Sequence, residues 1–304
     1  MSERSGQEVQ FEVFGRRITA KQWGNPSGRP FFALHGWLDN ANTFDRLAPY
    51  LPELNLLALD FAGHGYADHR GAGEHYQSAN DVQDVLAVAQ QLDWQQFGLI
   101  GHSMGASIAS ELSALLPEKV TEAVMIDGFV ATGGVTPDER LQQYRESLQR
   151  MLVTEPKAPK VYPDVETMAQ RVTEATDQSL AAASVLVARG HKTVAGGVTW
   201  RTDPRIRYPS PYRHSRELLD VLLSGSRQPN LLIVAEQGDR WYQGEIEATQ
   251  AVHPNLTVRR MPGPHHIHLE PKYVRQVAEF TREFLNLTPM PDSAVDQLEW
   301  DGTL

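Results

Sequence analysis

The chain has 304 residues, of which 41% are hydrophobic and 22% are charged, with a formal net charge of −10 and no cysteine. These values are typical of a soluble globular protein, and the acidic balance disfavours nucleic acid or an anionic membrane as the main partner. The lack of cysteine excludes disulfides, a thiolate nucleophile and cysteine-bound metals, and it is compatible with the cytoplasm, where we expect the protein to reside. No apolar run is long enough to span a bilayer, and residues 1–5 lack a signal-peptide core, so we expect no membrane span.

Hydrophobic patterning predicts alternating strands and helices up to Asp127. Strands are expected at residues 9–14 and 18–23, which form a hairpin, and at 31–35, 55–60, 97–100 and 123–126, with helices at 78–92 and 106–116. The short apolar runs are typical of strands covered on both faces. The alternation predicts an α/β fold with a mostly parallel, twisted sheet.

The alternation stops after Asp127 and resumes about 100 residues later. In between, only helical or irregular patterns occur, with helices expected at 137–151 and 165–189. A long insertion of this kind predicts a helical cap over the C-terminal edge of the sheet, placed before the last two strands. The predicted division is a core of residues 1–128 and 229–287 with final strands at 231–234 and 256–261 and a helix at 271–285, a cap of residues 129–228, and a C-terminal tail of residues 288–304.

Gly101-His102-Ser103-Met104-Gly105 lies between a predicted strand and a predicted helix. A serine flanked by glycines at such a junction is a nucleophile elbow. The sharp turn strains the serine backbone, and the glycines allow the strand and the helix to approach each other. We therefore expect Ser103 to be a nucleophile with a helix N-terminus behind it.

An activated serine requires a base that takes its proton and an acid that orients the base. On a sheet of this kind the partners follow in the order serine, acid, histidine, each after a later strand. Asp239 follows the strand at 231–234, and His265 follows the strand at 256–261. These two residues are the expected acid and base.

Three further motifs carry a family resemblance. They are His35-Gly36-Trp37, Asp60-Phe61-Ala62-Gly63-His64-Gly65 and Gly263-Pro264-His265-His266-Ile267-His268-Leu269-Glu270-Pro271. With the elbow, they make the chain resemble the α/β-hydrolase fold superfamily from about residue 9 to 286, which implies about eight strands flanked by helices. The His-His-x-His run and Trp200-Arg201-Thr202-Asp203-Pro204-Arg205 resemble the serine-hydrolase-like, carboxylesterase-type branch. Counting back from Glu270 puts the catalytic histidine of the family on His265.

The chain departs from the family pattern at both partners of the serine. Pro264 replaces the usual glycine before the histidine, which leaves His266 as an alternative base. The acid motif of the family has its aspartate one residue earlier than Asp239. Some members take the acid from the strand before the cap, where Asp127 lies, and Glu236 is a third candidate. All three acids remain open at this stage.

The oxyanion hole is expected from the backbone N–H groups of Trp37 and Met104. Trp37, His102 and Trp241 are expected to line the substrate pocket. The arginines of the cap are expected to form salt bridges, with binding of an anionic substrate as the alternative. The basic residues concerned are Arg201, Arg205, Arg207, Arg213 and Arg216.

We therefore expect a cofactor-free serine hydrolase, a carboxylesterase that cleaves short-to-medium acyl esters through an acyl-enzyme, acting on a small-molecule ester as a monomer or homodimer. Hydrolysis of an amide, thioester or carbon–carbon bond on the same residues is the alternative, and a non-catalytic binding protein is a further one. His265, His266 and His268 are not expected to bind a metal, because no carboxylate lies at regular ligand spacing from them.

Overall fold

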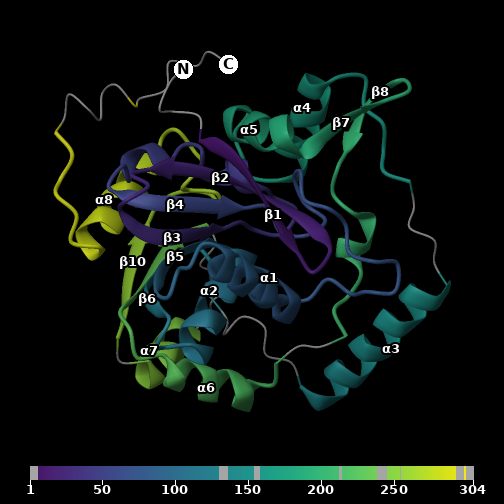
Figure 1. Cartoon of the computed structure of the whole chain (residues 1–304). Helices are drawn as coiled ribbons and strands as arrows, with labels where there is room; N and C mark the ends of the chain where they lie inside the picture. The colour runs from purple at the N-terminus through teal and green to yellow at the C-terminus, as the bar shows by residue number, and fades with distance from the viewer. Residues whose placement is uncertain are drawn as a thin grey trace.

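A computed structural model of the chain describes residues 6–129, 136–153, 158–211, 214–237, 245–253, 255–291 and 298. Figure 1 displays a twisted sheet with helices packed on both of its faces. The sheet has eight strands in the order β1-β2-β4-β3-β5-β6-β9-β10. The strands are β1 (Gln7–Val13), β2 (Arg16–Gly24), β3 (Arg29–Leu34), β4 (Leu54–Leu59), β5 (Phe97–His102), β6 (Val120–Ile126), β9 (Asn230–Ala235) and β10 (Leu256–Met261).

The strand directions match the predicted fold. β1 pairs antiparallel with β2, and β2 pairs antiparallel with β4, whereas all the other neighbours in this sheet are parallel. The expectation of an α/β-hydrolase fold with about eight mostly parallel strands is therefore confirmed. Because parallel strands point the same way, the loops after β5, β6, β9 and β10 all begin at one edge of the sheet.

The central strands are covered on both faces, as their apolar runs predicted. In β3, Phe31 and Ala33 pack in a cluster with α8 (Val274–Phe284). Phe32 and Leu34 face the opposite way and pack with α1 (Ser78–Gln91) and α2 (Met104–Leu115). Side chains that alternate along a strand point to opposite faces, so each strand contributes to two hydrophobic layers.

Two shorter helices complete the second face at the β6–β9 end of the sheet. They are α6 (Arg216–Gly225) and α7 (Glu245–Val252), which the sequence patterns did not predict. Leu219 and Leu223 of α6 and Ile246 of α7 pack with Leu232 of β9. Short 3₁₀ helices occur in loops at η1 (Ala41–Phe44), η2 (Ala48–Tyr50) and η4 (Pro204–Arg207).

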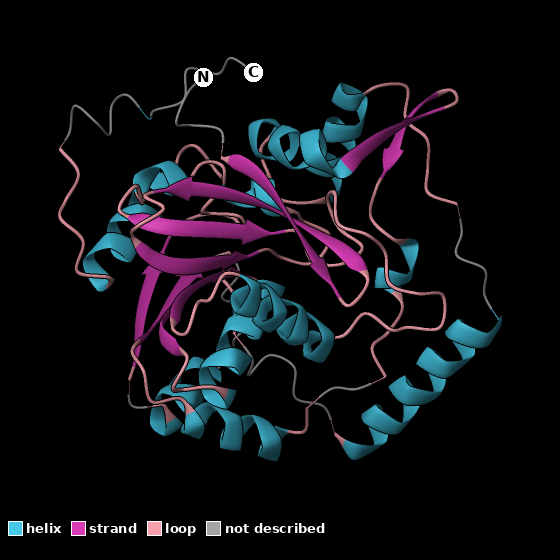
Figure 2. Ribbon diagram, viewed as in Figure 1, coloured by secondary structure: helices cyan, strands magenta, loops and turns pink. Residues whose placement is uncertain are grey.

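The segment between β6 and β9, where the cap was expected, differs in detail from its prediction. It contains α3 (Pro137–Val153), α4 (Val165–Ala175), α5 (Leu180–Gly190) and a hairpin of β7 (His191–Val194) and β8 (Gly197–Trp200). The single helix expected at 165–189 is two helices, because the Ser179 side chain accepts the N–H of Ala182 and starts a new helix. The hairpin was not expected, since its strands have four residues each and β7 is largely exposed. Figure 2 shows the hairpin beside α4 and α5.

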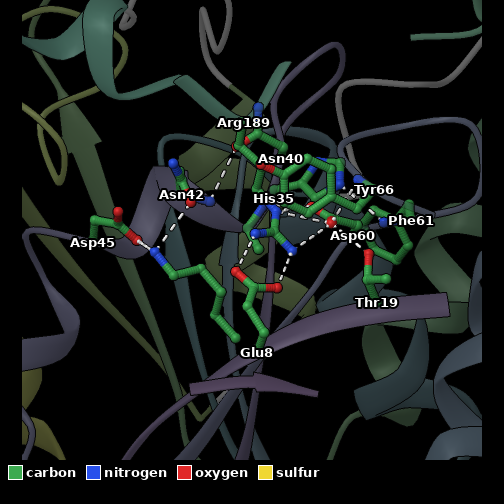
Figure 3. A network of polar contacts seen from close by, with 12 residues as sticks. Glu8, Thr19, His35, Asn40, Asn42, Asp45, Asp60, Phe61, Tyr66 and Arg189 are labelled. Atoms are coloured by element: carbon green, nitrogen blue, oxygen red, sulfur yellow. Dashed lines mark hydrogen bonds and ion pairs between the residues drawn. The ribbon is translucent and has the colours of Figure 1, made fainter. Parts of the chain in front are cut away.

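A buried ion-pair network fixes α5 to the core (Figure 3). The Nε of Arg189 lies 3.0 and 2.9 Å from the two carboxylate oxygens of Asp60, which follows β4. One terminal nitrogen of Arg189 lies 2.5 Å from Oε1 of Glu8 in β1. Asp60 also accepts hydrogen bonds from the Thr19 hydroxyl at 2.6 Å and from the N–H of Ala41 at 2.9 Å. Segments far apart in the chain are thus held together by one carboxylate.

In Figure 1, α3 lies apart from the sheet, and its residues Leu141, Leu148 and Leu152 are exposed.

Among the helices of the described ranges, none combines the length and the apolar character needed to cross a membrane. Most of the predicted tail at 288–304 lies outside the described residues.

Candidate active site

Ser103 occupies the turn between β5 and α2 with a strained backbone. Its φ is 51° and its ψ is −113°, a region that residues other than glycine rarely adopt. A Cβ at Gly101 would overlap the carbonyl oxygen of Gly105, and a Cβ at Gly105 would overlap that of Leu34. The N–H of Ser103 donates to the carbonyl oxygen of Ile126 at 3.0 Å. The two glycines are therefore required for the tight turn that presents this serine.

Asp127 follows β6, the strand next to β5, and both of its carboxylate oxygens have a defined partner. Oδ2 lies 2.5 Å from Nδ1 of His265, and Oδ1 accepts the N–H of Ala235 at 3.0 Å. The aspartate is 1% exposed and has a φ of 44°. Its carboxylate is thus held at both oxygens: Oδ1 by the backbone of β9 and Oδ2 by the imidazole of His265.

The contact with Asp127 changes the acidity of His265. Burial opposes protonation of the imidazole, but the hydrogen bond and the negative charge of Asp127 outweigh it and raise the pKa of His265 above its usual 6.5. A carboxylate on Nδ1 also keeps the proton there, so that Nε2 is free to accept another proton. This is the state that a general base requires.

The backbone of His265 is held from two sides. Its N–H donates to Oδ2 of Asp177, in the loop between α4 and α5, at 3.1 Å. Its carbonyl oxygen lies 3.1 Å from Nε2 of His102, the last residue of β5. The loop that carries His265 is therefore fixed both by the segment over the sheet and by the strand before the elbow.

The structure brings Ser103, Asp127 and His265 to the same edge of the sheet. Within the described part of the chain, the Ser103 hydroxyl makes no hydrogen bond, as is common before a substrate binds. Asp239, the first candidate for the acid, lies outside the described residues, and so does Trp241. Glu236 follows β9 and has an exposed side chain.

The two residues expected at the oxyanion hole follow two neighbouring parallel strands, β3 and β5. Met104 is the first residue of α2, so its N–H has no carbonyl partner within the helix. Trp37 is 50% exposed, and its indole N–H donates to the carbonyl oxygen of Ile206 in η4 at 3.3 Å. Trp37 therefore lies against the segment between β6 and β9.

His102 and His266 lie in the interior. Nδ1 of His102 is 3.2 Å from Oδ2 of Asp39, and Nε2 of His266 is 3.2 Å from the same oxygen. His102 was expected to line the substrate pocket, but its side chain is 1% exposed and turned toward Asp39. His266, the alternative base, contacts Asp39 rather than Asp127. The ring of His268 lies against that of His102, tilted by 40° with centroids 4.3 Å apart, which completes a buried histidine cluster.

Sequence reasoning missed three polar residues around the histidine loop: Asp39, Asp177 and Gln178. Asp39 lies only two residues after the His35-Gly36-Trp37 motif, which was the available signal. Asp177 and Gln178 precede α5, and the amide nitrogen of Gln178 lies 2.9 Å from each ring nitrogen of His266. No sequence pattern marked this loop as a partner of the histidines.

Among the arginines, Arg205 forms a salt bridge of 2.6 Å with Asp203, as expected. Arg201 lies over the ring of Tyr66 and Arg207 over that of Trp37. Arg213 and the side chain of Arg216 lie outside the described part of the chain.

Comparisons with known proteins show the family to which this fold belongs. The sequence model of the family described as alpha/beta hydrolase fold matches residues 29–272. The chain is 30% identical to a serine hydrolase-like protein from Dictyostelium discoideum, over 95% of this chain and 85% of that protein. It is also 30% identical to serine hydrolase-like protein 2 from Homo sapiens, over 93% of this chain and 95% of that protein.

A solved structure is also similar. The crystal structure of a hypothetical protein from Pseudomonas aeruginosa PAO1 superposes with a TM-score of 0.87 at 37% identity, covering 92% of this chain and 99% of that one. The chain therefore belongs to the α/β-hydrolase superfamily. Within that superfamily it falls in the serine hydrolase-like branch, which supports a hydrolytic function.

Proposed function

We propose that the protein is a serine carboxylesterase in which Ser103 is the nucleophile, His265 the base and Asp127 the acid. The observation that carries the proposal is the 2.5 Å contact between Asp127 and His265, next to the strained elbow of Ser103. Asp239 was the first candidate from sequence. We now favour Asp127, because its second oxygen is held by Ala235 in the orientation that the imidazole needs.

In the proposed reaction, Oγ of Ser103 attacks the ester carbonyl while Nε2 of His265 takes its proton. Asp127 keeps the proton of His265 on Nδ1 and stabilises the imidazolium that forms. The N–H groups of Trp37 and Met104 stabilise the negative oxygen of the tetrahedral intermediate, a type of contact worth roughly 3 kcal/mol for each donor. His265 then protonates the departing alcohol, and water releases the acid from Ser103.

We further propose that the segment between β6 and β9 acts as a cap that limits the acyl group to short or medium length. Support comes from its direct contacts with the site. Asp177 binds the backbone of His265, and the N–H of Ser179 donates to Glu270 at 2.8 Å. Ile206 accepts the indole N–H of Trp37. A segment tied to both ends of the site is suited to enclosing a small substrate.

The test combines a series of p-nitrophenyl esters of rising acyl length with a fluorophosphonate probe. We expect turnover to peak at short or medium chains, and the probe to modify Ser103 in the parent chain but not in Ser103→Ala. A matched control is Ser107→Ala, one turn further along α2. This variant should keep both ester turnover and modification by the probe. A folded protein that neither reacts with the probe nor cleaves any ester of the series would overturn the proposal.

A further inference from the structure

Three buried side chains next to the proposed catalytic residues converge from two loops and from the end of a strand. Asp39 follows β3, His102 ends β5, and His266 follows β10. Their ligand-type atoms, a carboxylate oxygen and two ring nitrogens, all lie within 4.8 Å of one another. The residues are 5%, 1% and 8% exposed. Two imidazoles and a carboxylate form a common donor set for a divalent transition-metal ion.

The distances from the two imidazole nitrogens to Asp39 fit a shared metal ion better than direct hydrogen bonds. Charged hydrogen bonds to a carboxylate are usually about 2.7–2.9 Å long. Here His102 and His266 both stop 3.2 Å from Oδ2 of Asp39, whereas His265 approaches Asp127 to 2.5 Å. Ligand atoms about 2.0–2.1 Å from a tetrahedral ion are separated by about 3.3 Å. The distances at Asp39 are close to that value.

The protons of His102 give a second argument. Its Nδ1 faces the Asp39 carboxylate, and its Nε2 faces the carbonyl oxygen of His265, so both neighbours are acceptors. A neutral imidazole carries a single N–H and can donate to only one of these two acceptors. One of the two contacts then lacks a proton. With an ion on Nδ1, the N–H on Nε2 donates to the His265 carbonyl, which is the usual outer contact of a metal-bound histidine.

The position of Gln178 beside His266 is compatible with such an ion. Its Oε1 is buried and has no hydrogen-bond partner among the described residues, while its amide nitrogen faces the ring of His266. If Nε2 of His266 binds an ion, Nδ1 carries the proton and needs an acceptor. Turning the amide of Gln178 over supplies Oε1 as that acceptor. A metal ion thus resolves the bonding of His102, and Gln178 is placed to accept the remaining N–H of His266.

We propose that Oδ2 of Asp39, Nδ1 of His102 and Nε2 of His266 bind one Zn²⁺ ion. Because all three ligands are buried, the ion would not meet substrate. Each ligand is close in sequence to a residue of the proposed active site: Asp39 follows Trp37 by two positions, His102 precedes Ser103, and His266 follows His265. The ion would join the loop of the oxyanion hole, the strand that ends before the nucleophile, and the loop of the base. The metal site does not depend on which ester the enzyme cleaves.

The experiment uses the full, untagged chain stripped with a chelator and then titrated with Co²⁺, which reports a tetrahedral site by its visible absorption. We expect one equivalent to bind, Zn²⁺ to displace it, and either ion to raise the melting temperature. His266→Gln removes a ligand and should abolish the Co²⁺ spectrum. Gln178→Leu removes only the outer acceptor and should weaken binding by about 10–100-fold.

His75→Ala is the matched control, because this histidine is not one of the three clustered residues, and its loss should leave stoichiometry and affinity unchanged. Circular dichroism of each variant checks that it is folded. The proposal fails if the folded parent chain gives no tetrahedral Co²⁺ spectrum. It also fails if His266→Gln binds Co²⁺ as tightly as the parent, since the ion would then lie elsewhere. Neither result bears on esterase activity, which the fluorophosphonate probe tests separately.

Discussion

The Asp127 carboxylate and the His265 imidazole are in contact at 2.5 Å although 138 positions separate them in the chain. The aspartate comes from the strand before the inserted segment, and the histidine comes from the loop after the last strand. Their pairing puts the proposed acid directly after β6, the strand next to β5, whereas Asp239 occurs after β9.

Replacing Asp127 with Asn should lower kcat by about 10³–10⁴-fold with little change in KM, because the amide favours the wrong tautomer of His265. Steady-state kinetics on one p-nitrophenyl ester measures this. Asp239→Asn is the control and should stay within about threefold of the parent. The opposite ranking of the two variants would return the acid to Asp239.

Ser103→Ala should abolish ester turnover, by roughly 10⁴-fold or more, and leave the melting curve almost unchanged. The hydroxyl carries the chemistry, and within the described residues it makes no hydrogen bond that the fold would lose. Turnover near the parent level in purified Ser103→Ala would rule out this serine as the nucleophile.

His265→Gln should be nearly inactive, whereas His266→Gln should keep measurable turnover. The reason is orientation, since His265 contacts Asp127 and His266 contacts Asp39. Comparison of kcat for both variants on the same ester tests this assignment. If His266→Gln were the inactive one and His265→Gln retained activity, the base would be His266.

The pH profile should report the raised pKa of His265. The base is active only when neutral, so kcat/KM should fall as the pH decreases through an apparent pKa above 6.5. The same shift stabilises the folded state below the unfolded pKa of the histidine, and this stabilisation is lost as the pH rises through the folded pKa. In Asp127→Asn, the fall of the remaining kcat/KM on the acidic side of the profile should move to lower pH. If this apparent pKa stayed the same, a group other than His265 would control it.

Arg189→Met should destabilise the fold strongly, by about 3–5 kcal/mol, because it leaves the buried charge of Asp60 without its ion partner. Burial opposes ionisation of Asp60, but the charge and hydrogen bonds of Arg189 lower its pKa below 3.8. Urea unfolding measures the loss. Glu8→Gln changes the half-exposed end of the same network and should cost less than about 1 kcal/mol. Equal effects of the two substitutions would contradict this account.

Much of the fold could be predicted because local patterns determine it. The last strand, β10, coincides with the predicted residues 256–261, and α1 differs from its prediction by one residue. Both have patterns that repeat over several residues. The β7–β8 hairpin could not be predicted in this way, because its short strands are only partly buried and pair mainly with each other.

The sequence by itself determined the class of the protein, the nucleophile candidate and the histidine candidate. Glycine spacing around Ser103 and the order of strands and helices are local properties, and they permit only one kind of turn at that position. The tertiary structure decided which residues meet. Every strand of a parallel sheet ends at the same edge, so a carboxylate after β6 and one after β9 are equivalent in the sequence pattern. Only the packing in space, with Ala235 holding Asp127 against His265 and Asp39 lying between His102 and His266, distinguishes the carboxylates that contact the histidines.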